Sequence, residues 1–185
     1  MLICVLLGER LGLGYGELRL SRGTYGKPFL DRPDAPAFSL SHSGGWVVCA
    51  LADEAVGIDV ERIFPLDHET IQAILDGIKA DNDAKDGGAV DLVRFYGRWT
   101  MLESRLKAEG AGLSGRRIKN AFCLEPGKTS FRAEAGGGET PWIVETIPLQ
   151  EGYALSACRR PGEPPCREAD LLTWPELLTR FIRLF

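Results

Sequence analysis

The order of the predicted elements constrains the fold of this chain more than any other feature of its sequence. An apolar segment at residues 2–10 is followed by four strand candidates up to residue 61, and a helical region at residues 68–109 is followed by four more. Runs of helix followed by runs of strands are typical of α+β proteins. We therefore expect an α+β fold of two similar halves, residues 1–65 and 66–185, with a ligand cleft between them.

The strand candidates are short apolar runs bounded by turn residues. In the first half they are Glu17–Ser21, Ala37–Ser41, Trp46–Ala52 and Ala55–Glu61. In the second half they are Arg117–Leu124, Ser130–Ala135, Trp142–Ile147 and Tyr153–Arg159. The Pro-rich stretch at 26–36 is predicted to lie outside any sheet, because proline cannot donate to a strand ladder. The first apolar segment, Leu2–Arg10, fits a short helix or a buried strand, and its periodicity does not decide between the two.

Three helices are predicted. Asp91–Glu109 has the strongest signals, because its first residue suits the N-cap and Gly110 follows its end. His68–Lys79 carries apolar residues at helical spacing, and the polar, Gly-rich residues 80–89 after it are predicted to form a loop. The last helix is expected to start near Trp174, because a proline follows in the first turn.

Composition and charge exclude several functions. The chain has 22 Lys and Arg against 26 Asp and Glu, a net charge of -4, so no overall positive field attracts nucleic acid. The longest apolar runs, 2–7 and 46–52, are far shorter than the roughly 18–20 residues of a membrane span. No basic segment precedes the first run and no small-residue cleavage site follows it, which argues against a signal peptide. Five cysteines without a Cys-x-x-Cys pair fit neither a disulfide framework nor a zinc site. We expect a cytoplasmic protein that binds neither nucleic acid nor membrane.

Residues 56–61 (Val-Gly-Ile-Asp-Val-Glu) alternate strictly between branched apolar and other residues. In a strand, Asp59 and Glu61 would then point to one face, about 7 Å apart. Gly57 lies on the same face and leaves room for something to approach the backbone. An ordinary half-buried strand with a solvated polar face is the alternative.

A third carboxylate lies on the apolar side of the predicted helix at 91–109. At 100° per residue the apolar residues of this helix fall in one arc: Phe95, Tyr96, Trp99, Leu102 and Leu106. Glu103 falls inside that arc. A buried, ionised carboxylate has to be paired, protonated or bound to a cation, because its uncompensated burial is costly. An intrahelical salt bridge to Lys107, one turn further on, is the alternative.

These carboxylates suggest a metal site. If Asp59, Glu61 and Glu103 converge, they repel one another unless a hard cation lies among them. Oxygen ligands with open positions suit Mg²⁺, which takes further ligands from waters and substrate phosphates. The hydroxyls, imidazole and N–H groups of residues 41–45 (Ser-His-Ser-Gly-Gly) suit an anion, with a plain turn as the alternative. Lys27, stiffened by the following proline, is a weaker candidate for the same purpose.

Four stretches of the sequence form an ordered set of motifs. They are Tyr25-Gly26-Lys27-Pro28, residues 38–44 (Phe-Ser-Leu-Ser-His-Ser-Gly), residues 56–61, and residues 95–104 (Phe-Tyr-Gly-Arg-Trp-Thr-Met-Leu-Glu-Ser) running on to Lys107, Gly110, Gly112 and Leu113. Together, in this order, they resemble the Sfp-type 4′-phosphopantetheinyl transferase family. Each motif alone is weak, but the ordered set is specific, and the resemblance extends over nearly the whole chain. It implies two similar α+β halves, related by a pseudo-twofold axis, with the active site in the cleft between them.

The resemblance also implies an activity. It is the Mg²⁺-dependent transfer of 4′-phosphopantetheine from coenzyme A to a serine of an acyl or peptidyl carrier protein, with release of 3′,5′-ADP. By the same resemblance, Asp59, Glu61 and Glu103 would bind Mg²⁺, which would neutralise charge on the leaving group. Glu103 would also help to deprotonate the carrier serine, and Lys107 would contact the pyrophosphate. The residues that would hold the coenzyme's phosphates are Lys27, Ser41 and His42.

Departures from the family pattern leave alternatives open. Leu102 stands where members usually carry lysine, Met1 begins inside the stretch with which others start, and His68–Lys79 lacks the acidic residue of the family's helix. The first half is therefore expected to be short. The alternatives are a non-catalytic relative that binds coenzyme A or a carrier protein, and a Mg²⁺-dependent pyrophosphate hydrolase. A carrier is expected to dock on the basic residues at 116–119 or on the apolar loop at 111–113.

Overall fold

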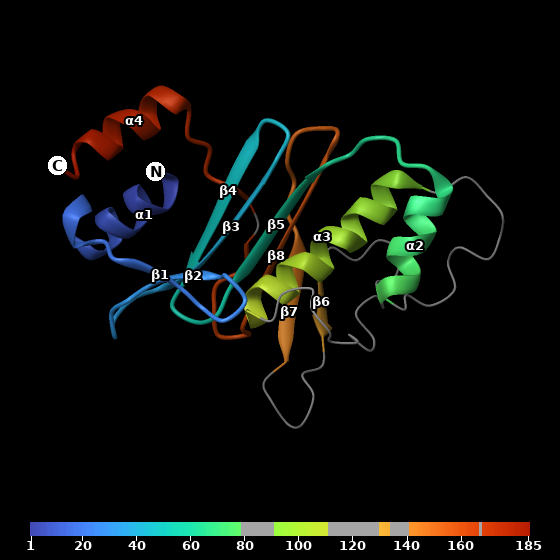
Figure 1. Ribbon diagram of the computed structural model, residues 1–185, viewed down its shortest axis with the longest axis horizontal. Coiled ribbons are helices and arrows are strands. Elements are labelled where there is room, and N and C mark those ends of the chain that lie inside the picture. Colours follow the sequence, from blue (N-terminus) through green and yellow to red (C-terminus); the bar gives the residue numbers. More distant parts are fainter. Residues whose placement is uncertain (79–90, 111–129, 134–140, 167) are drawn as a thin grey trace.

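The strands lie in the middle of the molecule, with helices at both ends (Figure 1). A computed structural model describes residues 1–78, 91–110, 130–133, 141–166 and 168–185. Helices α1 (Leu2–Leu11) and α4 (Trp174–Ile182) contact each other at one end, close to both chain termini. Helix α2 (His68–Ile78) lies at the opposite end.

The apolar segment at the N-terminus is a helix and not a strand. Helix α1 ends at Leu11, where Gly12 takes the left-handed conformation with φ of 66°. A residue without a Cβ adopts this conformation easily, which is why glycine so often follows a helix. Ile3 and Leu7 of α1 pack in a core cluster with Phe38. The helix therefore covers the strands of the first part of the chain.

The prediction that residues 26–36 lie outside any sheet was wrong for residues 28–30. β1 (Leu20–Arg22) and β2 (Pro28–Leu30) form an antiparallel hairpin in which Arg22 faces Pro28. Pro28 is tolerated because it is the first residue of an edge strand, where no ladder hydrogen bond needs its missing N–H. The strand predicted from residue 17 also begins later, because Tyr15–Glu17 forms a 3₁₀ helix, η1.

Two sheets form the centre of the fold. β3 (Ala37–Ser43) and β4 (Trp46–Ala52) form an antiparallel hairpin. The other sheet has four antiparallel strands in the order β5-β8-β7-β6, with bounds Gly57–Arg62, Tyr153–Arg159, Trp142–Thr146 and Ser130–Ala133. β3 lies against β5, although the two strands belong to different sheets. These strands confirm six of the eight predicted ones. The division of the chain into halves at residue 65 stays a prediction.

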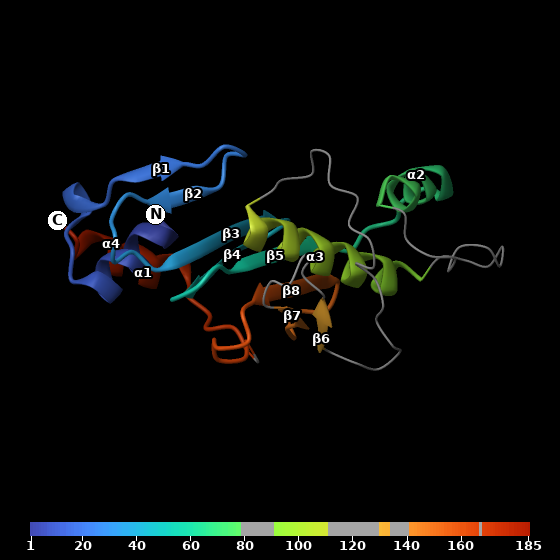
Figure 2. The ribbon, with the colours of Figure 1, turned by 90° about the horizontal axis from the view of Figure 1, so that it is seen from below.

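Helix α3 (Leu92–Glu109) lies across β5, β8 and β7, as Figure 2 shows from below. Its bounds confirm the predicted caps. The Asp91 side chain accepts a hydrogen bond from the Arg94 backbone N–H at 3.2 Å, and Gly110 ends the helix with φ of 67°. A side chain that accepts from a first-turn N–H satisfies a donor that the helix itself leaves without a partner.

Small side chains of α3 lie against the sheet, together with Met101, which packs with Trp142 and Val144 of β7. The Thr100 and Ser156 hydroxyls lie 2.8 Å apart between α3 and β8. A Cβ on Gly57 would lie 1.8 Å from the Ser104 carbonyl oxygen and 2.5 Å from the Ala108 nitrogen. The backbones of α3 and β5 therefore approach as closely as they do only because residue 57 has no side chain, which confirms the predicted role of this glycine.

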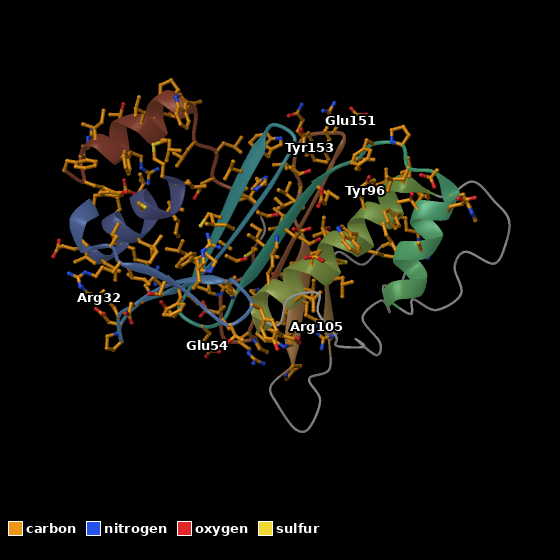
Figure 3. All side chains as sticks on the ribbon, in the orientation of Figure 1. Arg32, Glu54, Tyr96, Arg105, Glu151 and Tyr153 are labelled. Carbon is orange, nitrogen blue, oxygen red and sulfur yellow. The ribbon has the colours of Figure 1, made fainter. Side chains whose placement is uncertain are left out.

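The apolar arc predicted on α3 is buried partly against other elements. Phe95 and Tyr96 pack on Ile71 of α2, and the rings of Tyr96 and Phe64 lie 5.8 Å apart. Figure 3 shows Tyr96 on the part of α3 next to α2. An apolar arc predicts that one face of a helix is buried, but it does not predict which element covers that face.

Further helix predictions are confirmed at α2 and at α4, which begins at Trp174. The loop predicted at 80–89, the strand predicted at 117–124 and the candidate docking segments at 111–113 and 116–119 lie outside the described residues. Among the helices that are described, none combines the length and the apolar character of a bilayer span.

Candidate active site

The site lies where β3, β5 and α3 meet. Along β5, Ile58 and Val60 point into the core beneath the sheet. Asp59 and Glu61 point to the other side, where Asp59 contacts α3 and both carboxylates contact β3. This is the alternation that residues 56–61 predict, but the polar face of the strand is covered by a helix and a second strand and is not simply solvated.

Asp59 is only 3% exposed. Its Oδ1 accepts hydrogen bonds from Ser41 Oγ at 2.8 Å and from Lys107 Nζ at 2.6 Å. Its Oδ2 is buried and has no hydrogen-bond partner among the described residues. Burial raises the pKa of Asp59, and the Lys107 ammonium and the Ser41 hydroxyl oppose that shift. Asp59 is therefore a buried carboxylate with one oxygen anchored and the other without a partner.

Glu61 is held from two sides. Its Oε2 accepts a hydrogen bond from Ser43 Oγ at 2.9 Å, and the Trp99 side chain also hydrogen-bonds to this carboxylate. Burial is the main cause that raises the pKa of Glu61; the Ser43 hydrogen bond lowers it, and the charge of Asp59 raises it. From the sequence, Trp99 was predicted only as an apolar residue of the helix, because the partner of an indole N–H depends on contacts between distant segments.

Glu103 projects from α3 into the same region. Its Oε1 is buried and finds no hydrogen-bond partner in the part of the chain that the structure describes. Burial raises the pKa of Glu103 most, the charges of Asp59 and Glu61 raise it further, and Lys107 lowers it. The predicted alternative, a salt bridge from Glu103 to Lys107, is not formed, because the Lys107 ammonium bonds to Asp59 and Ser41 instead.

Two adjoining hollows run along α3. The first has a volume of about 350 Å³, and its polar lining is Ser41, His42, Asp59, Glu61, Trp99, Glu103 and Lys107. The second has a volume of about 230 Å³ and extends to Tyr25, Lys27, Pro28 and Gly110. Both are bounded by Leu40, Glu103 and Lys107. A ligand of sufficient length can therefore occupy both and contact Lys107 in between.

Lys27 reaches α3 from the hairpin of β1 and β2. Gly26, with φ of 82°, allows the tight turn that precedes it. The Lys27 ammonium donates to the Val56 carbonyl at 3.0 Å and to the Ala108 carbonyl at 3.4 Å. The carbonyls in the last turn of a helix attract cations. Burial lowers the pKa of Lys27. Lys27 thus lines the second hollow, and its charge rests on backbone oxygens.

His42 and Leu102 complete the set of residues singled out in the sequence. His42 is exposed on β3 and lines the first hollow. Leu102 is 2% exposed, so the position at which the resemblance leads us to expect lysine holds a buried apolar side chain. Among the described residues, Lys107 is the cation whose charge lowers the pKa of Glu103.

The donor atoms of the site fit a divalent cation. In the described parts of the chain, no three Asp, Glu, His or Cys side chains are grouped so that they could hold a metal ion by themselves. However, the two buried side-chain oxygens that lack a partner there, Asp59 Oδ2 and Glu103 Oε1, belong to carboxylates of the same hollow. Buried polar atoms without partners are rare and need an explanation. A hard cation would satisfy both oxygens and take its remaining ligands from waters and phosphates, as Mg²⁺ prefers.

Comparisons with known proteins place these residues in a wider context. A family model described as the 4′-phosphopantetheinyl transferase superfamily matches residues 55–158, which include Asp59, Glu61, Glu103 and Lys107. The chain is 31% identical to the 4′-phosphopantetheinyl transferase Sfp of Bacillus subtilis (strain 168) over 181 residues, which are 96% of this chain and 79% of Sfp.

Two further relatives give the same result. The 4′-phosphopantetheinyl transferase psf-1 of Bacillus pumilus is 29% identical over 182 residues, which are 97% of this chain and 76% of psf-1. The 4′-phosphopantetheinyl transferase ffp of Bacillus subtilis is 30% identical over 168 residues, which are 89% of this chain and 73% of ffp. These matches confirm the resemblance that the four sequence motifs indicated, and the mixed helix and strand structure agrees with the predicted α+β class.

Proposed function

The chain belongs to the 4′-phosphopantetheinyl transferase superfamily, and we propose that it transfers 4′-phosphopantetheine from coenzyme A to a serine of an acyl or peptidyl carrier protein, releasing 3′,5′-ADP. One observation carries the mechanism. Asp59 Oδ2 and Glu103 Oε1 are buried, without hydrogen-bond partners among the residues that the structure describes, in a hollow that Lys107 also lines. This combination of orphaned carboxylate oxygens and a cation suits a metal-bound pyrophosphate.

The reaction sets two chemical tasks. The carrier's serine oxygen forms a bond to the phosphorus that bears pantetheine, and the bond from that phosphorus to the bridging oxygen of the pyrophosphate breaks. The serine loses its proton, and 3′,5′-ADP leaves with additional negative charge. The site therefore has to accept a proton and to stabilise charge on phosphate oxygens.

We assign the proton to Glu103. Its carboxylate lines both hollows, and its Oε1 makes no hydrogen bond within the described residues. Burial and the charge of Asp59 raise the pKa of Glu103, which makes its carboxylate a stronger base. A serine hydroxyl that enters the hollow, directly or through a water, can therefore transfer its proton to Glu103.

Asp59, Glu61 and Glu103 are the residues that would hold Mg²⁺. When bound, Mg²⁺ supplies positive charge that stabilises the pyrophosphate and the leaving group. Asp59 contributes Oδ2, because its Oδ1 is already occupied by Ser41 and Lys107. Ser41 and Lys107 thus fix the orientation of the carboxylate before any ligand arrives.

The coenzyme's phosphates are assigned to the cations and donors of the two hollows. The Lys107 side chain is 29% exposed and borders both hollows, so its charge is accessible to a pyrophosphate that lies between them. Ser41 and His42 line the first hollow, and Lys27 lines the second. A phosphate at Lys27 would take the place of a backbone carbonyl as partner of its ammonium. The identity of the carrier and the cytoplasmic location stay predictions.

The alternative of a non-catalytic relative has no support in the described residues. The three carboxylates and Lys107 are all present at the first hollow, and the relatives compared above carry the name of the transferase activity. The presence of Leu102 in place of lysine does not remove any of the groups to which we assign a chemical step.

Intact mass spectrometry of a carrier protein tests the proposal. The purified protein is incubated with coenzyme A, Mg²⁺ and apo carriers from fatty acid, polyketide and peptide synthesis. We expect at least one carrier to gain phosphopantetheine, and we expect Glu103→Gln to slow the gain by about 100-fold or more, the range for loss of a general base. Glu151→Gln is the matched control, because Glu151 is an exposed carboxylate in the turn before β8 (Figure 3) and lines neither hollow.

Two results would contradict the proposal. Coenzyme A that binds but never modifies any carrier would favour the non-catalytic relative. Coenzyme A that is cleaved at its pyrophosphate when no carrier is present would favour the hydrolase.

A further inference from the structure

Three serines of β3 connect this strand to β5. The two strands lie side by side but belong to different sheets. Ser39, Ser41 and Ser43 alternate along β3, and each places its hydroxyl against β5. Their partners advance along β5 in the same order, from Ile58 to Asp59 and Glu61, so the two strands run in parallel. Serine hydroxyls thus take the place of a backbone ladder between the two strands.

The hydrogen bonds of Ser43 determine where its proton points. Its Oγ accepts the Arg62 backbone N–H at 3.0 Å and lies 2.9 Å from Glu61 Oε2. A hydroxyl has one proton, and a carboxylate oxygen can only accept it. The N–H of Arg62 therefore fills an acceptor position of the hydroxyl, while its proton is directed to Glu61. Ser41 has the same arrangement, because it accepts from Lys107 at 2.9 Å and donates to Asp59.

Glu61 needs such support more than Asp59 does. Its longer side chain has an additional rotatable bond, and it is only half-buried near the end of β5. Ser43 fixes Oε2, and Trp99 contacts the same carboxylate from α3. With one oxygen held, the direction of the other is restricted as well. Groups that orient a metal ligand in this way typically change metal affinity by 10–100-fold when they are removed.

The hairpin tip holds Ser43 in place. The Gly45 N–H donates to the Tyr153 hydroxyl of β8 at 3.1 Å, and Figure 3 shows Tyr153 near the turn of β3 and β4. A Cβ on Gly44 would lie 2.3 Å from the same hydroxyl oxygen. The turn that follows Ser43 is thus docked against the four-stranded sheet, and the position of Ser43 relative to Glu61 is set from both sides.

We propose that Ser43 is a positioning residue that orients the Glu61 carboxylate for a divalent cation, although Ser43 itself contacts neither the cation nor the substrate. This inference rests on the proposed function, because it requires the carboxylates to bind a metal. The role of Ser43 therefore differs from that of Ser41, which lines the first hollow and was predicted to contact phosphate.

Ser39 provides a matched control within the same row. Its Oγ accepts the Ile58 backbone N–H at 3.1 Å and contacts no carboxylate. Ser39→Ala leaves a buried N–H without a partner and should lower the stability of the fold. It should leave the orientation of Glu61 unchanged. Ser43→Thr keeps the hydroxyl and is the conservative variant.

Binding of Mn²⁺ alone tests the inference. The electron paramagnetic resonance signal of free Mn²⁺ is measured during titration of the wild type and of S43A, S43T and S39A, with unfolding by urea measured in parallel. We expect S43A to weaken Mn²⁺ binding by about 10–100-fold, S43T to bind nearly as tightly as the wild type, and S39A to lose stability without losing affinity. In transfer assays, S43A should raise the Mg²⁺ concentration needed for half-maximal rate and leave the rate at saturating Mg²⁺ nearly unchanged.

The outcomes distinguish a failure of the role of Ser43 from a failure of the proposed metal site. Unchanged Mn²⁺ affinity in S43A overturns the role of Ser43 and leaves the proposed metal site intact. An equal loss of affinity in S39A also overturns it, because the serine row would then act only by joining the two strands. If the wild type does not bind Mn²⁺, the proposed metal site fails and the inference fails with it.

Discussion

Replacing Gly57 with alanine tests whether the close approach of α3 to β5 positions the site. The new Cβ would lie 1.8 Å from the Ser104 carbonyl oxygen, whereas ordinary contact begins at 3.4 Å. The atoms that it meets belong to the backbone of a long helix and not to a flexible side chain. Relief therefore requires α3 to move away from β5 by about 1.6 Å.

Such a movement affects both stability and chemistry. Overpacking a close-packed contact lowers the free energy of unfolding by roughly 1–3 kcal/mol, occasionally more. The bond from Lys107 Nζ to Asp59 Oδ1, now 2.6 Å, would lengthen to about 4 Å, which is beyond hydrogen-bond range. Glu103, on the same helix, would be displaced from Asp59 by a similar amount. Misplacement of catalytic groups by about 1 Å can lower the rate 100-fold.

The assay combines urea unfolding with the rate of carrier modification. We expect G57A to lose about 1–3 kcal/mol of stability and at least about 100-fold in rate under conditions where it is fully folded. G97A is the control on the same helix, because a Cβ at Gly97 meets nothing within 4 Å; it should gain roughly 0.5–1 kcal/mol, since glycine in a helix interior is unfavourable. A G57A protein with the stability and rate of the wild type would refute the account of how α3 is placed.

Two further predictions concern the buried charges. Burial raises the pKa of Asp59 above its usual 3.8, so this group binds more protons in the folded state and its contribution to stability falls as the pH rises above that value. In thermal unfolding, D59N should gain stability relative to the metal-free wild type as the pH increases above 4, while its transfer activity is lost. A difference in stability that does not change with pH would contradict this prediction. Arg159 forms a bidentate ion pair with Glu145 at 2.8 and 2.9 Å, with side chains 8% and 14% exposed. R159M should lower the free energy of unfolding in urea by about 3–5 kcal/mol without changing Mn²⁺ affinity. A loss of affinity would show that this ion pair supports the site.

Local patterns were sufficient to predict the elements that carry the site. The alternation of residues 56–61 placed Asp59 and Glu61 on one face, and the cap signals at Asp91 and Gly110 fixed the ends of α3. These features depend on interactions within a few residues, so one sequence contains the information. The anomaly of Glu103, a carboxylate within an apolar arc, could be recognised for the same reason.

Contacts between distant segments could not be predicted in this way. The sequence did not show that Thr100, Ser104 and Ala108 of α3 lie against the sheet, because small residues give little apolar signal. Ser43 and Trp99 were missed as partners of Glu61, since Ser43 is 18 residues away and its contact depends on β3 lying beside β5. The Pro28 strand was missed because an edge strand differs from a loop only through its partner.

Crystals of the protein grown with Mn²⁺ and coenzyme A provide the most direct test of the central claim. Anomalous scattering locates manganese independently of the structural interpretation. We expect a peak within bonding distance of Asp59 Oδ2 and Glu103 Oε1, the two buried side-chain oxygens that lack partners in the described residues. A coenzyme bound in the hollows with no manganese at these oxygens, or with manganese elsewhere, would contradict this claim.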